Sequence, residues 1–80
     1  MYSVGDILIG NRSANGHYTI THEGVQVIVL DILEPDSNGN ERIEVKVLNE
    51  PGEYPVLASY FDLVKPSSNV VTNVKGVRLI

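Results

Sequence analysis

Chemistry in this chain would have to come from histidine, serine and carboxylate side chains, because the sequence contains no cysteine. His17 and His22 are five positions apart, and an odd spacing along an extended segment places two side chains on opposite faces. We therefore expect both histidines to lie at the surface without sharing a metal ion. None of the six serines stands in a Gly-x-Ser-x-Gly motif, and no glycine-rich phosphate loop precedes a helix. These patterns predict a protein that is not an enzyme and needs no cofactor.

Oxygen-bearing side chains alternate at Asp36, Asn38 and Asn40, as they do at the start of a calcium-binding loop. Such a loop also needs glycine at its sixth position and glutamate at its twelfth. This chain has Glu41 and Val47 at those two positions. We therefore interpret the run as a turn rich in Asp and Asn and predict no metal site.

Negative charge is concentrated in the middle of the chain. Residues 1–30 carry a net charge of −1, residues 31–53 carry −5, Asp62 adds −1, and the segment from Lys65 onward carries +3, for a total of −4. Proteins that bind duplex nucleic acid usually present a basic surface, because neutralising phosphates drives their affinity. The acidic middle therefore argues against duplex nucleic acid as the partner. It predicts either a solvated surface that keeps the protein soluble or a surface that binds another protein.

Four of these carboxylates are expected on one exposed hairpin: Glu34, Asp36, Glu41 and Glu44. General acid catalysis needs a carboxylate whose pKa is raised by burial or by a close like charge, and an exposed hairpin offers no burial. We therefore interpret the four side chains as a protein-binding surface. On a partner that normally binds nucleic acid, they would stand in for phosphates.

Aromatic side chains form a second candidate surface, in or beside the predicted loops: Tyr18, Tyr54, Tyr60 and Phe61. Such rings can hold a peptide, a methylated side chain or a stacked base. We assign Tyr54 and Tyr60 to the protein-binding surface, with the alternative that Phe61 and one or two tyrosines close the end of the core. A different alternative is a site for a nucleotide or single-stranded nucleic acid, formed with Tyr60 by Arg12, His17 and Tyr18.

The elements that would position these residues are β-strands. Val, Ile and Thr occur 12, 7 and 3 times and favour strands, whereas Gly or Pro interrupts every window of helical periodicity. Extended segments are predicted at residues 6–9, 18–21, 25–33, 42–48, 56–58 and 63–65, with a 3₁₀ turn at 59–62. Asn38-Gly39 predicts a type I′ hairpin between residues 25–33 and 42–48. In the second of these strands, Ile43, Val45 and Val47 are expected to face the core.

The long strand at residues 25–33 is apolar on both faces. One alternating set is Val25, Val27, Val29 and Leu33, and the other is Ile28, Leu30 and Ile32. A strand of a lone small barrel should show one face to water, so this strand needs a cover. The C-terminal segment provides candidates in Val70, Val71, Val74, Val77 and Leu79, on two predicted strands at residues 70–74 and 77–80. We expect residues 70–80 either to fold back over the barrel or, as we prefer, to form a homodimer.

Short strands at close spacing predict an all-β fold that closes into a small barrel. The succession Val4-Gly5-Asp6, a long first loop, Gly24 before a valine-rich strand, a hairpin, Tyr54-Pro55-Val56 and Tyr60-Phe61-Asp62-Leu63 resembles the SH3-like barrels. Gly10-Asn11, Ala14, Tyr18 and the segment 21–24 resemble, more closely, small SH3-like proteins of phages and prophages of Gram-positive bacteria. The resemblance covers residues 3–65. It departs at Val27, where many such barrels have a glycine, and the absence of Trp separates the chain from signalling SH3 domains.

The resemblance implies a five-stranded SH3-like barrel at residues 1–65 with a C-terminal β extension at residues 66–80. It also implies a phage or prophage accessory protein that binds or inhibits a host or defence protein. The nucleotide site and a structural assembly subunit remain the alternatives. No apolar run approaches the roughly 18 residues that span a bilayer, and the N-terminus lacks a signal peptide. We therefore expect a cytoplasmic protein with no membrane partner.

Overall fold

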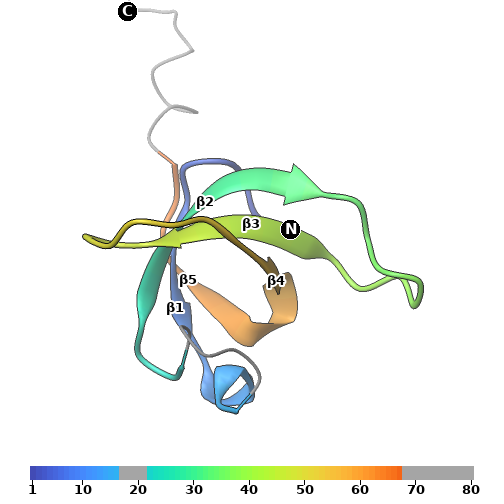
Figure 1. Ribbon diagram of the computed structural model, residues 1–80, viewed down its shortest axis with the longest axis horizontal. Coiled ribbons are helices and arrows are strands. Elements are labelled where there is room, and N and C mark those ends of the chain that lie inside the picture. Colours follow the sequence, from blue (N-terminus) through green and yellow to red (C-terminus); the bar gives the residue numbers. More distant parts are fainter. Residues whose placement is uncertain (17–21, 68–80) are drawn as a thin grey trace, which may run out of the picture.

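The computed structural model describes residues 1–16 and 22–67. In chain order the elements are β1 (Ile7–Gly10), η1 (Arg12–Ala14), β2 (Gln26–Leu33), β3 (Arg42–Val47), β4 (Tyr54–Leu57), η2 (Ala58–Tyr60) and β5 (Phe61–Lys65), where η marks a 3₁₀ turn (Figure 1). The predicted all-β class is confirmed. The strands predicted at residues 18–21, 70–74 and 77–80 lie outside the described residues. The tail segment at residues 70–80, with its predicted homodimer, lies outside them as well.

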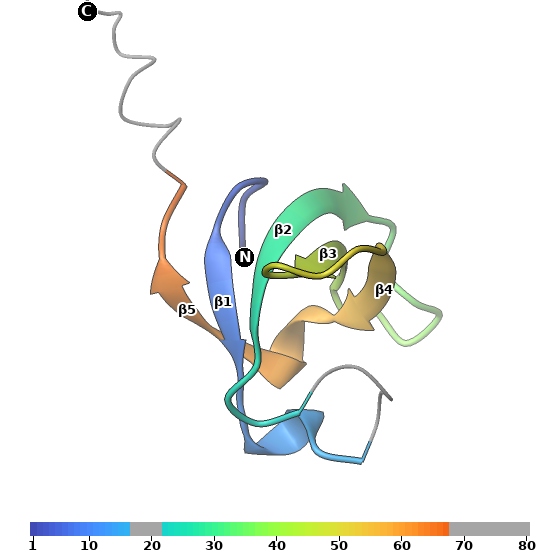
Figure 2. The same cartoon turned by 60° about the vertical axis from the view of Figure 1, so that its left-hand side comes forward.

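The five strands form one curled antiparallel sheet in the order β4-β3-β2-β1-β5. β4 and β5 are the two edges of this sheet, and η2 carries the chain from one edge to the other (Figure 2). The prediction of a closed barrel is therefore wrong for the described part of the chain, because no ladder joins β4 to β5. In the described part of the chain, a 3₁₀ turn and not a strand ladder connects the two edges.

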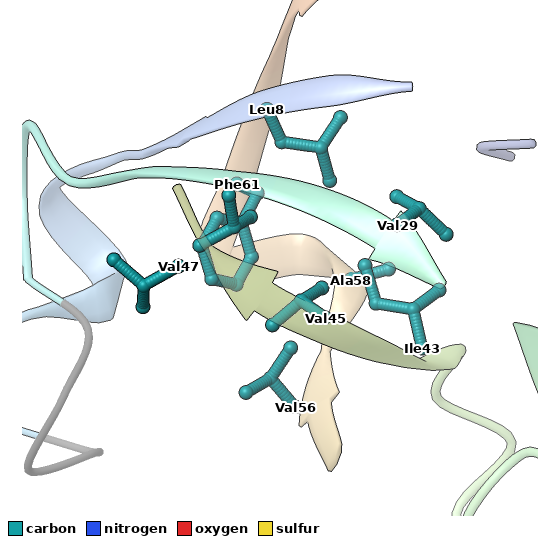
Figure 3. Close-up of a cluster of buried hydrophobic side chains, with 9 residues drawn as sticks. Leu8, Val29, Ile43, Val45, Val47, Val56, Ala58 and Phe61 are labelled. Atoms are coloured by element: carbon teal, nitrogen blue, oxygen red, sulfur yellow. The ribbon is translucent and has the colours of Figure 1, made fainter. Parts of the chain in front are cut away.

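The core fills the concave side of the curled sheet. Its members are Leu8, Val27, Val29, Ile43, Val45, Val47, Val56, Ala58 and Phe61, and most of them converge in Figure 3. Along β3, buried and half-buried residues alternate strictly. The prediction that Ile43, Val45 and Val47 face the core is confirmed.

β2 contains a β-bulge that changes which of its residues share a face. Val29 lies opposite Val45, but Asp31 lies opposite Glu44 and Ile32 opposite Ile43. The additional residue, Leu30, reverses the alternation, so that Ile32 joins the face of the buried Val29.

Two expectations about β2 change as a result. Leu33, which lies opposite Arg42, does not share a face with Val29, and Ile32 does not share one with Ile28. The described residues leave Ile28 and Leu30 half-buried. A cover from residues 70–80 stays a prediction, since that segment lies outside the structure described.

Candidate binding surface

The β2–β3 connection projects from the sheet and is organised by one carboxylate (Figure 1). Oδ1 of Asp36 accepts hydrogen bonds from the backbone N–H groups of Asn38 and Asn40, each at 2.9 Å. Oδ2 accepts from Nδ2 of Asn40 at 3.1 Å. These bonds, first among them the one from the Asn40 backbone, hold the pKa of Asp36 below its usual value. The interpretation of this run as a turn rich in Asp and Asn is confirmed.

The turn itself differs from the predicted type. Gly39 has a positive φ of 83°, but Asn38 does not have a positive φ. Within the described residues, Asn49 is the only residue other than glycine that does. A type I′ turn needs positive φ at both central residues, so Asn38-Gly39 does not form one. The side chain of Asp36 closes the loop in its place.

The four predicted carboxylates divide into two places. Glu34, Asp36 and Glu41 lie in the β2–β3 connection, whereas Glu44 lies within β3, opposite Asp31 of β2. Asp31 was not among the predicted site residues, because its pairing with Glu44 depends on the bulge. We call the region carrying Asp31, Glu34, Asp36, Glu41 and Glu44 the acidic arm.

The β3 strand of the acidic arm also carries two basic side chains, Arg42 and Lys46. Nε of Arg42 donates a hydrogen bond to the backbone oxygen of Glu34 at 2.9 Å. Arg42 therefore ties the two strands together at the base of the arm. With two cations and five carboxylates, the arm keeps a net negative charge.

The predicted aromatic residues do not act as one free cluster. Phe61 is 2% exposed and belongs to the core, as the alternative interpretation predicted. Tyr54 and Tyr60 are half-buried and pack against that core. Tyr54 begins β4, opposite Val45, whereas Tyr60 ends η2. The structure therefore does not join these two tyrosines to the tip of the acidic arm.

The first loop approaches η2, as the alternative ligand site would require. Asn11 donates from its backbone N–H to the oxygen of Tyr60 at 2.9 Å and from Nδ2 to the oxygen of Ser59 at 3.0 Å. Its Oδ1 accepts from the N–H of Ser13 at 2.8 Å. Asn11 thus places η1, which carries the exposed Arg12, beside Tyr60. His17 and Tyr18 lie outside the described residues.

Two adjoining cavities lie between the acidic arm and the N-terminal residues that help to line them. Their volumes are about 380 Å³ and about 350 Å³. Both are lined by Met1, Tyr2, Gly39 and Glu41. Sequence reasoning did not find this place, because Tyr2 has no motif around it and reaches the sheet only through tertiary packing.

Comparisons with protein-family models, with curated proteins and with solved structures found no significant match for this chain. Within residues 1–16 and 22–67, no three His, Cys, Asp or Glu side chains are grouped so that they could hold a metal ion. No helix in the same ranges is long and apolar enough to cross a membrane.

Proposed function

We propose that this chain is a non-enzymatic protein-binding module whose acidic arm docks on a basic surface of a partner protein. The observation that carries the proposal is the concentration of five carboxylates on one projecting hairpin. All five residues are exposed or half-buried. The bonds around Asp36 preorganise the connection, so that docking orders fewer rotatable groups than a loose acidic loop would.

The architecture supports an SH3-like assignment within this proposal. The long loop between β1 and β2 and the 3₁₀ turn between β4 and β5 are typical of SH3-like barrels, and a curled five-stranded sheet suits a partly open barrel. Together with the resemblance to small phage proteins, this favours a host or defence protein as the partner. Inhibition would follow if the acidic arm occupied a channel that normally holds nucleic acid.

Two other functions remain as alternatives. The first is a nucleotide or single-stranded nucleic-acid site, favoured by the packing of η1 against η2, which brings Arg12 toward Tyr60. The second, a structural assembly subunit, has the positions of β4 and β5 at the two sides of the sheet in its favour, because edge strands can add strands from other chains. Only the main proposal requires the negative charge of the acidic arm for binding, so removing this charge distinguishes it from both alternatives.

The test compares two double variants of equal charge change. Glu34→Gln with Glu44→Gln removes two charges from the arm, and Glu50→Gln with Glu53→Gln removes two exposed charges from the β3–β4 loop. Each immobilised protein is incubated with a lysate of a Gram-positive bacterium, and captured proteins are quantified by mass spectrometry at low and high salt.

We expect one captured protein to be retained by the wild type and the loop variant and bound roughly two- to thirty-fold more weakly by the arm variant. That protein should also be released by salt and by added nucleic acid. Equal retention by both double variants would contradict the proposal.

A further inference from the structure

The two cavities at the base of the arm share four lining residues and form one groove, which is partly apolar. Ile32, Leu33 and Ile43 line the larger cavity. Ile43 is 2% exposed, but Ile32 is 43% exposed, because the bulge turns it to the concave side beyond the core. A volume of about 380 Å³ falls within the range of roughly 300–1,000 Å³ typical of ligand sites.

The N-terminal wall of the groove is held in place by a hydrogen bond. The hydroxyl of Tyr2 donates to the backbone oxygen of Phe61 at 2.6 Å, across 59 positions of the chain. This bond anchors the Tyr2 ring against the core. The groove therefore has a preformed aromatic wall, which lowers the entropy lost when a ligand binds.

The lining of the groove also contains a carboxylate. Glu41 lines both cavities. The pKa of the Tyr2 phenol is raised first by burial and then by the carboxylates of Asp62, Glu41 and Asp6, so three negative charges act on this wall. The opposing cation in the larger cavity is Arg42, whose Nε is bonded to the oxygen of Glu34.

We propose that this groove binds an extended segment of the protein partner, with an aliphatic side chain beside Ile32 and a lysine or arginine side chain against Glu41. The proposal rests on the protein-binding function above and specifies which side chains of the partner the groove at the base of the acidic arm would recognise. The exposed Ile32 loses water when the aliphatic group covers it. The cation gains the field of Glu41, which lines both cavities.

The experiment titrates the 80-residue chain with three short peptides and follows the methyl resonances of Met1, Ile32 and Ile43 by NMR. The probes are acetyl-Gly-Leu-Lys-Gly-amide, its Leu→Ser analogue and its Lys→Glu analogue. We expect the first peptide to shift these resonances with a dissociation constant on the order of 1 mM, as suits so small a ligand. Each analogue should bind at least about fivefold more weakly, because each removes one of the two proposed contacts.

Two variants assign the contacts. Glu41→Gln should remove the preference for Lys over Glu and keep the preference for Leu over Ser. Ile32→Ser should do the reverse. Both side chains are exposed, so neither change is expected to unfold the protein, and Glu53→Gln serves as the control for loss of a charge elsewhere.

Three results would overturn the groove proposal. They are no shift of the three methyl groups at 10 mM peptide (a concentration about tenfold above the expected constant), equal binding of the Lys and Glu peptides, and shifts that follow protein concentration without peptide. The last would assign the groove to a second copy of the chain. If the arm variant loses lysate capture and no peptide binds the groove, the groove proposal is wrong and the proposed function is supported. If the peptide binds and the arm variant still captures the partner, the groove proposal is supported and the proposed function is wrong.

Discussion

The carboxylate of Asp6 holds the backbone of Ser67 across 61 positions of the chain. Oδ1 of Asp6 accepts a hydrogen bond from the N–H of Ser67 at 2.6 Å, and both residues are only 6% exposed. Oδ2 accepts from the N–H of Ser3 at 2.8 Å, and the Asp6 backbone oxygen accepts from the N–H of Val29 at 3.0 Å. One residue thus joins the N-terminal segment, β2 and the segment that follows β5.

Replacing this residue by Asp6→Ala should lower the free energy of unfolding by about 2–3 kcal/mol. The reason is that two backbone N–H groups lose a charged acceptor, and one of them is left buried. Urea unfolding followed by far-UV circular dichroism measures the change. Glu53→Ala, at an exposed loop position, is the control and should stay within about 0.5 kcal/mol of the wild type. Equal stability of the two variants would show that the bond to Ser67 contributes nothing.

A methyl group at Gly10, the last residue of β1, should be far more damaging than one at Gly24 in the loop that follows. A Cβ on Gly10 would lie 2.2 Å from the backbone oxygen of His22, whereas a Cβ on Gly24 would meet nothing within 4 Å. Gly24 has a φ of 93°, so Gly24→Ala carries the cost of left-handed backbone, about 1–2 kcal/mol. We expect Gly10→Ala to cost about 3 kcal/mol or more, because backbone must move. Thermal unfolding of both variants checks this order, and the reverse order would contradict the packing of this loop.

The Asp36 carboxylate should stabilise the hairpin in a pH-dependent way. Its pKa in the folded protein is lowered from 3.8 by hydrogen bonds from Asn40, so the folded state favours the ionised form. This stabilisation is present above the unfolded-state pKa and is lost as the pH falls through the lower folded-state pKa.

Asp36→Ala should therefore melt at a lower temperature than the wild type at pH 7, and the difference should shrink as the pH falls below the unfolded-state value of 3.8 and through the lower folded-state pKa. Thermal melts across this range measure it, with Ser37→Ala as the neighbouring control. A difference that does not change with pH would mean that the ionised carboxylate is not what holds the turn.

The Tyr2 phenol should ionise above its ordinary pKa of 10.0, because burial and nearby carboxylates disfavour the phenolate. The neutral hydroxyl stabilises the folded protein below pH 10.0, and this contribution disappears as the pH rises through the raised pKa. Absorbance at 295 nm, titrated for the wild type and for Tyr2→Phe, isolates the Tyr2 transition by difference.

At neutral pH, Tyr2→Phe should cost about 1 kcal/mol for the lost bond to the Phe61 oxygen. Tyr54→Phe is the comparison for loss of a hydroxyl elsewhere. A difference titration centred below 10 would contradict the buried, negatively surrounded position of this ring.

Local patterns in the sequence were sufficient to predict features whose geometry depends on a single strand or a single turn. The alternation through Ile43, Val45 and Val47 fits a strand with a single core face, since side chains repeat every two residues. The spacing of Asp36, Asn38 and Asn40 indicated a turn, because short polar side chains bond to nearby backbone. The charge pattern was sufficient to predict Glu34, Asp36, Glu41 and Glu44 as one acidic surface. It did not predict that Asp31 belongs to the same surface.

Other features depended on contacts between distant segments. In a mostly apolar run such as Val27–Leu33, the sequence does not determine which side chains face the core. Pairing with β3 introduces the bulge that places Ile32 on the same face as Val29. The turn type depended on the Asp36 side chain and not on the Asn-Gly pair. The gap between β4 and β5, the Tyr2 bond to Phe61 and the Asp6 bond to Ser67 join residues far apart in the chain. Hydrophobic alternation specifies which side chains are buried, but the register of partners and the groove beside Glu41 arise only when the chain packs.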